Sequence, residues 1–192
     1  MLATTQKPDL FDSVLHPTDF SRASERAFAH ALALALIGAT RFTLLHVGHV
    51  KPGQRDWQRF PAVRGTLERW GLLEPGSPRS AVFEQLQVRV EKIVVPRGSP
   101  ASAVLMYSED EPFDLIVLGT EGREGVSRWL KGSRAEALAR ATKTLSLFVP
   151  DRAERGFVSA ADGAVSLGRV LVPVDHEPPA HGAIAVAKRL TD

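Results

Sequence analysis

Cysteine is absent from this sequence of 192 residues. Its absence excludes disulfide bonds, thiolate zinc sites, thiol redox chemistry and a cysteine nucleophile. A long hydrophobic run is also missing, since the longest, residues 31–39, is roughly half as long as a membrane-spanning helix. The first residues lack the charged start and apolar core of a secretory signal. We therefore expect a cytoplasmic protein without a membrane partner.

A large charge of one sign is missing too. The 24 lysines and arginines nearly balance the 22 aspartates and glutamates, which leaves a formal net charge of +2. This balance gives no reason to expect nucleic acid or an acidic membrane surface as a partner. The hydrophobic share of 44% and the charged share of 24% are ordinary for a globular protein.

Apolar segments alternate with helical patterns along residues 11–150. Strands are predicted at residues 14–16, 42–47, 88–95, 115–118 and 145–149, and helices at residues 24–37, 61–70, 101–108 and 133–141, with a helical turn at 80–86. Pro17 is expected to end the first strand, because proline has no N–H to donate to a central ladder. This alternation predicts an α/β fold: a doubly wound, mostly parallel five-stranded sheet with helices on both faces.

Ligands of such sheets bind at the carboxyl ends of the strands, near the point where the strand order reverses. Two stretches qualify: the turn at residues 17–21 and the glycine-rich stretch at residues 119–133. A candidate ligand site is therefore expected where these two stretches meet.

The last quarter of the chain repeats part of the first. Residues 170–175 (VLVPVD) resemble residues 14–19 (VLHPTD), and an alanine-rich helix is expected after each copy. We predict one domain at residues 1–150, a linker at 151–167, and the first strand and helix of a truncated second copy at 168–192. A lone strand and helix cannot bury their apolar face, so residues 169–174 are expected to join a sheet edge in this molecule or in a partner.

The glycines after the fourth strand form the strongest local signal. Gly119 follows the strand, Gly122 comes next, and Gly132 and Ser133 stand at the start of the predicted helix. Glycine lets the backbone approach a ligand closely, and a helix N-terminus offers N–H groups to a phosphate. The same residues are equally consistent with turn glycines and a serine N-cap. A Walker A loop is excluded, because Lys131 precedes Gly132 instead of following it.

The chain resembles the universal stress protein family over residues 11–150, and the start of a second copy over 168–192. The resemblance rests on the pattern glycine, two residues, glycine, nine residues, glycine and serine, and on the segments HPTDFS, LLHV, GSPASAVL and DLIVLGTEGREG. It implies a stress-response regulatory module that binds ATP, with or without Mg²⁺, and pairs into a homodimer through the fifth strand.

The resemblance also implies which residues hold the nucleotide. Pro17, Thr18 and Asp19 would contact the adenine, the backbone of Val47 would contact the base, Gly119 would lie by the ribose, and Gly122, Gly132, Ser133 and the amide of Arg134 would wrap the phosphates.

One position departs from the family pattern. Many ATP-binding members carry a second hydroxyl residue two positions after the serine, where this chain has Ala135. A hydrogen bond to a charged group contributes about 1.5–3 kcal/mol, so its loss implies weaker affinity. Arg134 either offsets this by its charge or points to solvent, and the sequence leaves both open.

Catalytic and metal-binding residues are not predicted. No general base is positioned by any pattern, so any hydrolysis is expected to be slow. The main interpretation is an adenine-nucleotide binding module without efficient catalysis. A slow ATPase or phosphotransfer enzyme that uses the same loop, and a ligand-free dimerisation scaffold, stay open as alternatives.

Overall fold

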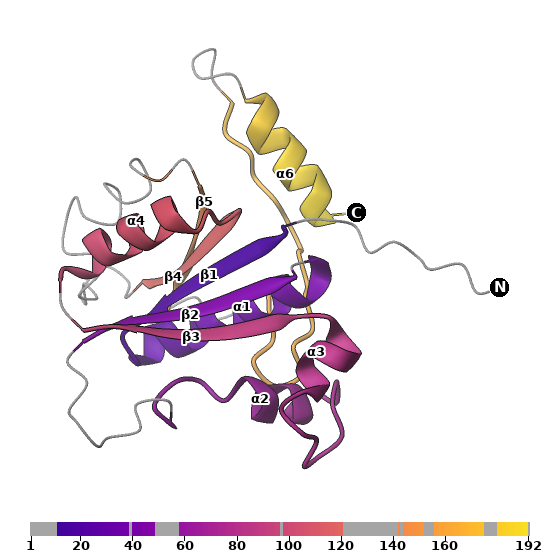
Figure 1. The fold of residues 1–192 in the computed structure, drawn as a ribbon. Helices are drawn as coiled ribbons and strands as arrows, with labels where there is room; N and C mark the ends of the chain where they lie inside the picture. Colours follow the sequence, from indigo (N-terminus) through magenta and orange to yellow (C-terminus); the bar gives the residue numbers. More distant parts are fainter. Residues whose placement is uncertain are drawn as a thin grey trace.

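A computed structural model describes residues 11–38, 40–48, 58–96, 98–120, 142, 144–151, 156–174 and 180–191. Its elements, in chain order, are β1 (Ser13–Thr18), α1 (Arg22–Gly38), β2 (Arg41–Val47), α2 (Val63–Arg69), α3 (Ala81–Leu86), β3 (Arg89–Val95), α4 (Pro100–Asp110), β4 (Leu115–Thr120), β5 (Leu145–Pro150) and α6 (His181–Thr191) (Figure 1). The helix expected at residues 133–141 lies outside the described residues.

The five strands form one sheet in the order β3-β2-β1-β4-β5, and every neighbouring pair is parallel. The chain runs outward from β1 through β2 to β3 and then returns to the other side of β1 for β4 and β5. The strand order therefore reverses between β1 and β4, which is the switch point of a doubly wound sheet. The predicted α/β fold is confirmed.

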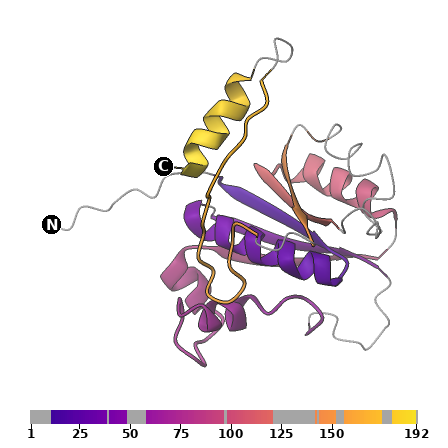
Figure 2. The ribbon, with the colours of Figure 1, turned by 180° about the vertical axis from the view of Figure 1, so that it is seen from behind.

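Helices cover both faces of the sheet. The long helix α1 lies on the face that is turned toward the reader in Figure 2, and α4 lies on the opposite face. Beneath α1, α2 and α3 is the larger group of buried apolar side chains, which includes Phe28, Phe42 and Leu44. A smaller group, with Leu15 and Ile116, lies beneath α4. Strands covered on both faces explain why β2 and β4 read as largely apolar runs.

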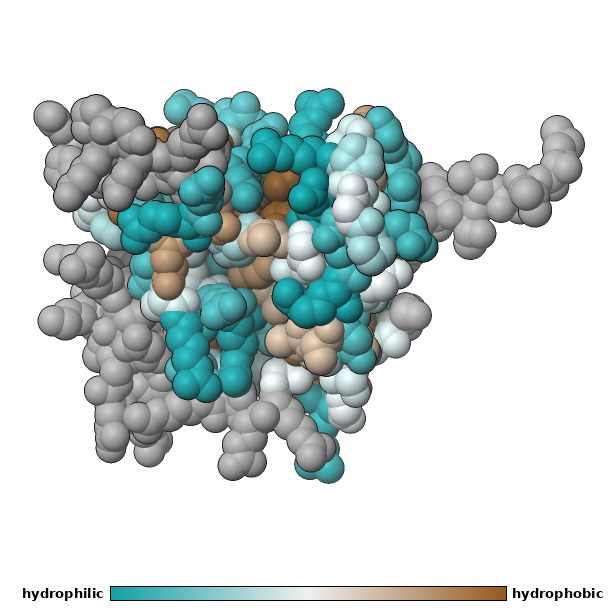
Figure 3. Space-filling model, turned by 90° about the horizontal axis from the view of Figure 1, so that it is seen from below, coloured by the Kyte–Doolittle hydropathy of each residue, from teal (hydrophilic) through white to brown (hydrophobic). Residues whose placement is uncertain are grey.

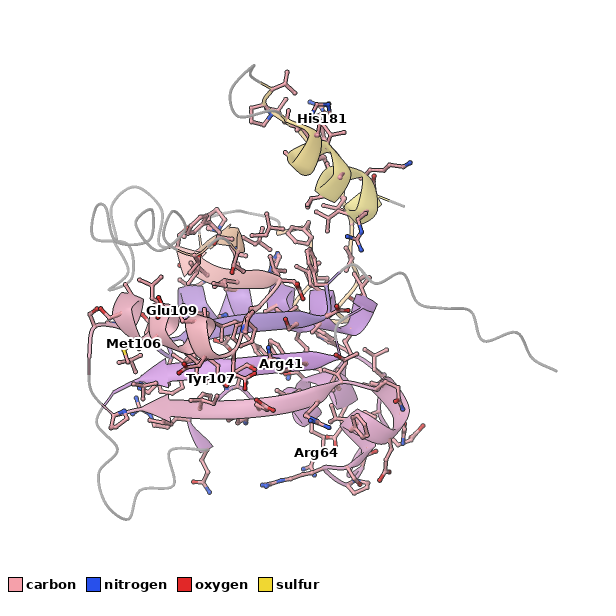
Figure 4. The ribbon with its side chains drawn as sticks, turned by 45° about the horizontal axis from the view of Figure 1, so that its top comes forward. Arg41, Arg64, Met106, Tyr107, Glu109 and His181 are labelled. Atoms are coloured by element: carbon pink, nitrogen blue, oxygen red, sulfur yellow. The ribbon has the colours of Figure 1, made fainter. Side chains whose placement is uncertain are left out.

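Arg41 and Tyr107 mark the α4 face of the sheet. Figure 4 shows both side chains between α4 and the strands, whereas Met106 and Glu109 point outward from the same helix. The Arg41 guanidinium lies 4.5 Å from the centre of the Phe113 ring. Ser99 caps the start of α4, because its side chain accepts a hydrogen bond from the backbone N–H of Ser102.

The expected end of the first strand at Pro17 is wrong. β1 continues to Thr18, and Pro17 lies opposite Leu45 of β2. Pairing with β4 is the part that stops early, after Leu15 and Ile116. A proline is tolerated here because its missing N–H affects only one of the two neighbouring strands.

Residues 156–167, within the predicted linker, carry a small hairpin that lies across α1 (Figure 2). Val158 and Val165 form an antiparallel bridge. Val158 is buried, and its N–H donates to Nε2 of His30 at 3.4 Å. The hairpin is therefore packed against the domain at residues 11–150.

Residues 169–174 do not join the sheet of this molecule. The described part of this segment forms no strand, and Leu171 is 88% exposed. The following helix α6 has no fully buried residue. Its Leu190 packs, partly buried, against the main core, and most of the helix projects away from the sheet (Figure 2). The expectation that residues 169–174 add to a sheet edge is wrong for this molecule, and a strand pairing with a partner is not tested.

None of the described helices is both long and apolar enough to cross a bilayer.

Candidate functional site

The predicted ligand residues that the structure describes gather at one edge of the sheet. Pro17 and Thr18 end β1, Asp19 follows, Val47 ends β2, and Gly119 is the last residue but one of β4. Carboxyl ends of parallel strands share an edge, so the strand order alone brings these residues together. Gly122, Gly132, Ser133 and Arg134, the predicted phosphate-binding residues, lie outside the described residues.

The turn after β1 is held by its own side chains. The Asp19 carboxylate accepts a hydrogen bond from the Ser21 N–H through Oδ1 at 2.9 Å, and the Thr18 hydroxyl accepts from the Phe20 N–H at 3.1 Å. Phe20 has a φ of 63°, which is uncommon for a residue other than glycine. Ser21 then caps α1 by accepting the N–H of Ser24 at 3.2 Å. The turn therefore has a defined shape before any ligand arrives.

Gly119 is required by the close approach of β4 to the start of α1. A Cβ added to Gly119 would lie 2.4 Å from the carbonyl oxygen of Ala23 and 2.9 Å from the Ser24 nitrogen. Both atoms belong to the backbone and cannot rotate away. The absence of a side chain at Gly119 thus brings the end of β4 against the first turn of α1.

His16 links the three elements that meet beneath this edge. Its Nδ1 lies 2.9 Å from the Val117 carbonyl oxygen of β4, and its Nε2 lies 3.3 Å from the hydroxyl of Ser24 on α1. The Ser24 hydroxyl in turn shares a hydrogen bond of 2.7 Å with the Thr18 hydroxyl. Because a carbonyl oxygen only accepts, Nδ1 carries the proton and a neutral ring leaves Nε2 as the acceptor.

The protonation state of His16 follows from its burial. Desolvation lowers its pKa from 6.5 to about 4, although the Val117 carbonyl, the charge of Asp19 and the Ser24 bond oppose the shift. The ring is therefore neutral at physiological pH, and its two nitrogens connect β1 to β4 and to α1. His16 is a functional residue that the sequence patterns did not indicate. Its position immediately before a proline in a buried strand is the signal that would have indicated this role.

Aromatic rings close the β2 side of the edge. The Phe20 ring lies 4.1 Å from the His46 ring and 5.5 Å, edge-on, from the Phe60 ring. His46 is held in turn, because its Nδ1 lies 2.8 Å from the Thr18 carbonyl oxygen. These contacts leave the carboxyl ends of β1 and β4 as the polar part of the edge, with the Asp19 carboxylate half-buried there.

Comparison with known proteins assigns the chain to a family. The model of the universal stress protein family matches residues 10–150. Universal stress protein MJ0577 of Methanocaldococcus jannaschii is 25% identical over 142 residues, covering 66% of this chain and 87% of the relative. A universal stress protein of Thermus aquaticus is 29% identical over 127 residues, covering 66% of this chain and 90% of the relative.

Solved structures show the same kind of likeness at lower identity. A universal stress protein in complex with cAMP has a TM-score of 0.47 and 19% identity, covering 73% of this chain and 98% of that chain. A universal stress protein family member from Burkholderia pseudomallei has a TM-score of 0.41 and 22% identity, covering 73% and 97%. Because the family model matches residues 10–150, which are most of the chain, this chain belongs to the universal stress protein family.

Proposed function

We propose that this chain is a cytoplasmic regulatory protein that binds an adenine nucleotide, with ATP as the main candidate. The nucleotide would lie where β1 and β4 end. One observation carries the proposal: the glycine and serine pattern that begins at Gly119 leaves the sheet beside the shaped turn that contains Asp19. The turn supplies polar groups for a nucleoside, and the glycine pattern supplies the backbone that a phosphate chain needs.

The nucleoside half of the proposal rests on Thr18, Asp19 and Val47. One oxygen of the Asp19 carboxylate accepts the Ser21 N–H, and no second hydrogen bond of this carboxylate is found within the described ranges. The other oxygen is therefore available to accept a hydrogen bond from the adenine, the part of the nucleotide that the family resemblance assigns to this turn. The backbone at Val47, where β2 ends, suits the edge of the base, and Pro17 and Thr18 supply the surface beneath it.

The phosphate half rests on sequence alone. Gly122, Gly132, Ser133 and the amide of Arg134 match the family pattern residue by residue. Ala135 lacks the second hydroxyl, so the affinity for ATP should fall below that of members that have it. Mg²⁺, if it accompanies ATP, would be held by the phosphate oxygens, which are ligands of suitable chemistry.

Efficient hydrolysis is not part of the proposal. His16 is buried, neutral and bonded on both ring nitrogens, so it cannot activate a water molecule for attack. One oxygen of the Asp19 carboxylate accepts the Ser21 N–H, and the other is assigned to the nucleoside instead of a water molecule. The chain should therefore act through its nucleotide-bound shape. A homodimer through β5 is part of the same proposal, because this edge strand leaves Leu145 and Phe148 exposed.

Calorimetric titration with ATP, ADP and cAMP, followed by a phosphate-release assay, tests the proposal. Saturable binding of ATP with negligible release supports it, whereas steady turnover would indicate a slow ATPase. Gly122→Val should abolish binding, because a branched side chain blocks close approach of the phosphates. Gly168→Val is the matched control, since nothing lies within 4 Å of an added Cβ at Gly168. If no ATP binding is detected, the proposal fails and a ligand-free scaffold remains.

A further inference from the structure

A second hollow lies between α1 and α2, on the sheet face that α1 covers. Its volume is about 430 Å³, which falls within the range of small-molecule sites. Of the proposed nucleotide residues that the structure describes, Thr18 borders it, and Pro17, Asp19, Val47 and Gly119 do not. Seen from below, the molecule shows apolar side chains in the middle of a largely hydrophilic surface (Figure 3). The hollow between α1 and α2 therefore needs an explanation of its own.

The floor of this cavity is apolar. Phe28 and Trp70 are almost fully buried, and both line it. The Trp70 indole N–H already donates to the Ala160 carbonyl oxygen at 3.1 Å. With its one polar group satisfied, Trp70 offers the cavity only its hydrocarbon surface.

The rim of the cavity is positively charged. Four arginines from three parts of the chain line it, against one carboxylate: Arg22 and Arg26 from α1, Arg59 from the segment before α2, Arg69 from α2, and Glu25. Arg59 lies over the Phe20 ring at 4.6 Å, and Arg69 donates to the Thr66 hydroxyl at 3.2 Å. Neither has an acidic partner in the part of the chain that the structure describes. Arg22 is paired with Asp151 at 3.9 Å, so the charge that an anion would complement is that of Arg59 and Arg69.

One wall comes from beyond the family domain. Ala160 lines the cavity, and it belongs to the hairpin that follows residue 150, where the family match ends. Gly163 fixes the hairpin against Trp70: its φ is 73°, and an added Cβ would lie 2.5 Å from the indole ring. Phe157 packs edge-on against His30, with ring centres 4.7 Å apart. The complete cavity is thus a feature of this chain's own extension.

We propose that this cavity is a second ligand site, which binds a small organic phosphate monoester with an apolar group. The apolar group would lie against Phe28 and Trp70, and the phosphate would lie between the guanidinium groups of Arg59 and Arg69. Planar guanidinium groups bind phosphate oxygens in pairs, so two arginines match a doubly charged head.

Phenyl phosphate is the probe that combines both parts. Phenol lacks the anion and inorganic phosphate lacks the ring, so each should bind at least about tenfold more weakly than phenyl phosphate, which corresponds to about 1.4 kcal/mol. The titration uses the full chain with Trp57→Phe and Trp129→Phe, which leaves Trp70 as the only tryptophan. We expect a saturable change in its fluorescence.

Charge-removing variants locate the binding. Arg59→Gln together with Arg69→Gln should weaken phenyl phosphate binding at least about tenfold. Arg79→Gln together with Arg89→Gln removes the same charge away from this cavity and should leave binding unchanged. Ala62→Phe, which narrows the cavity without altering charge, should also weaken binding, and it serves if the arginine variant fails to fold.

Three outcomes would overturn the inference. One is the absence of saturation below about 10 mM phenyl phosphate. Another is equal loss of binding in the two double-arginine variants. The third is loss of phenyl phosphate binding in Gly122→Val, which would place the probe in the nucleotide site. Failure of the nucleotide proposal is seen separately, in the ATP titration, and leaves the Trp70 signal unaffected.

Discussion

The Nδ1 atom of His16 donates a hydrogen bond of 2.9 Å to the carbonyl oxygen of Val117, immediately beside the proline that ends the ladder between β1 and β4. A backbone N–H at position 17 would normally bond the neighbouring strand, and Pro17 has none. The imidazole side chain takes its place. One side chain therefore satisfies a buried carbonyl group and joins the two strands at the switch point.

Replacing His16 by leucine should destabilise the fold by about 2 kcal/mol, because a buried acceptor is left without a partner. Leucine keeps most of the volume, so the loss reports the hydrogen bonds. The free energy of unfolding in urea measures it. His181→Leu, on the exposed face of α6, is the control and should change little (Figure 4). An equal loss in both variants would show that Val117 does not depend on His16.

The free energy of unfolding should decrease as the pH is lowered, because His16 stays neutral in the folded state. Its folded pKa of about 4 lies below the 6.5 of the unfolded chain. As pH falls from 6.5 to 4, the unfolded state takes up a proton that the folded state refuses, so the stabilisation is present above 6.5 and lost by about pH 4. The loss amounts to about 3 kcal/mol. Burial also lowers the pKa of His30, which adds a loss in the same direction.

Urea unfolding at several pH values checks this dependence. His16→Gln should show a flatter dependence than the unaltered protein, because glutamine does not titrate. His30 and the carboxylates are present in both proteins and cancel in the comparison. Parallel curves would contradict the assignment of the pH dependence to His16.

Gly119→Ala should destabilise the protein by about 1–3 kcal/mol, since the new methyl group meets the Ala23 carbonyl oxygen and α1 must shift. The shift also moves the Asp19 turn, so ATP affinity should fall in the same variant. Thermal unfolding and calorimetry measure the two effects. Gly168→Ala, in open space, should leave both unchanged. A Gly119→Ala protein with unchanged stability would show that α1 and β4 are not in close contact.

The hairpin should detach when Gly163 is replaced by alanine. Alanine at position 163 would have to adopt a φ of 73°, and its Cβ would lie 2.5 Å from the Trp70 ring. Gly76→Ala is the matched control, because Gly76 has a φ of 80° but nothing within 4 Å. Limited proteolysis should cut residues 156–166 faster in Gly163→Ala than in Gly76→Ala. Equal rates would mean that the Trp70 contact does not hold the hairpin.

Much of the fold is predictable from sequence because buried parallel strands leave a clear local signature. The apolar runs at residues 42–47, 115–118 and 145–149 became β2, β4 and β5, and the expected helix at 61–70 is α2, Val63–Arg69. The continuation of β1 through Pro17 was not predictable in this way. It depends on pairing with β2, where Pro17 lies opposite Leu45, and on the side-chain bond of His16 to Val117, which lies far away along the chain.

The candidate sites also include a part that the sequence predicts and a part that it does not. The meeting of the turn at residues 17–21 with the end of β4 followed from the rule that ligands bind at strand ends. The assignment of Pro17, Thr18, Asp19 and Val47 to a nucleoside came from the family resemblance and stays a prediction. The cavity between α1 and α2 did not follow, because Arg22, Arg59 and Arg69 come from separate elements and carry no common spacing. The hairpin had a usable signal that was missed: Asp162-Gly163 between two apolar segments is a strong turn pair.

Asp19→Asn should separate the shape of the turn from its charge. An asparagine oxygen still accepts the Ser21 N–H, so the turn and the stability of the protein should be kept. The proposed bond from the adenine would lose its charged acceptor, so the Kd for ATP should rise about tenfold. Asp162→Asn, in the exposed hairpin turn, removes the same charge elsewhere and should leave the Kd unchanged. Calorimetry that finds equal affinities for both variants would move the nucleoside away from the end of β1.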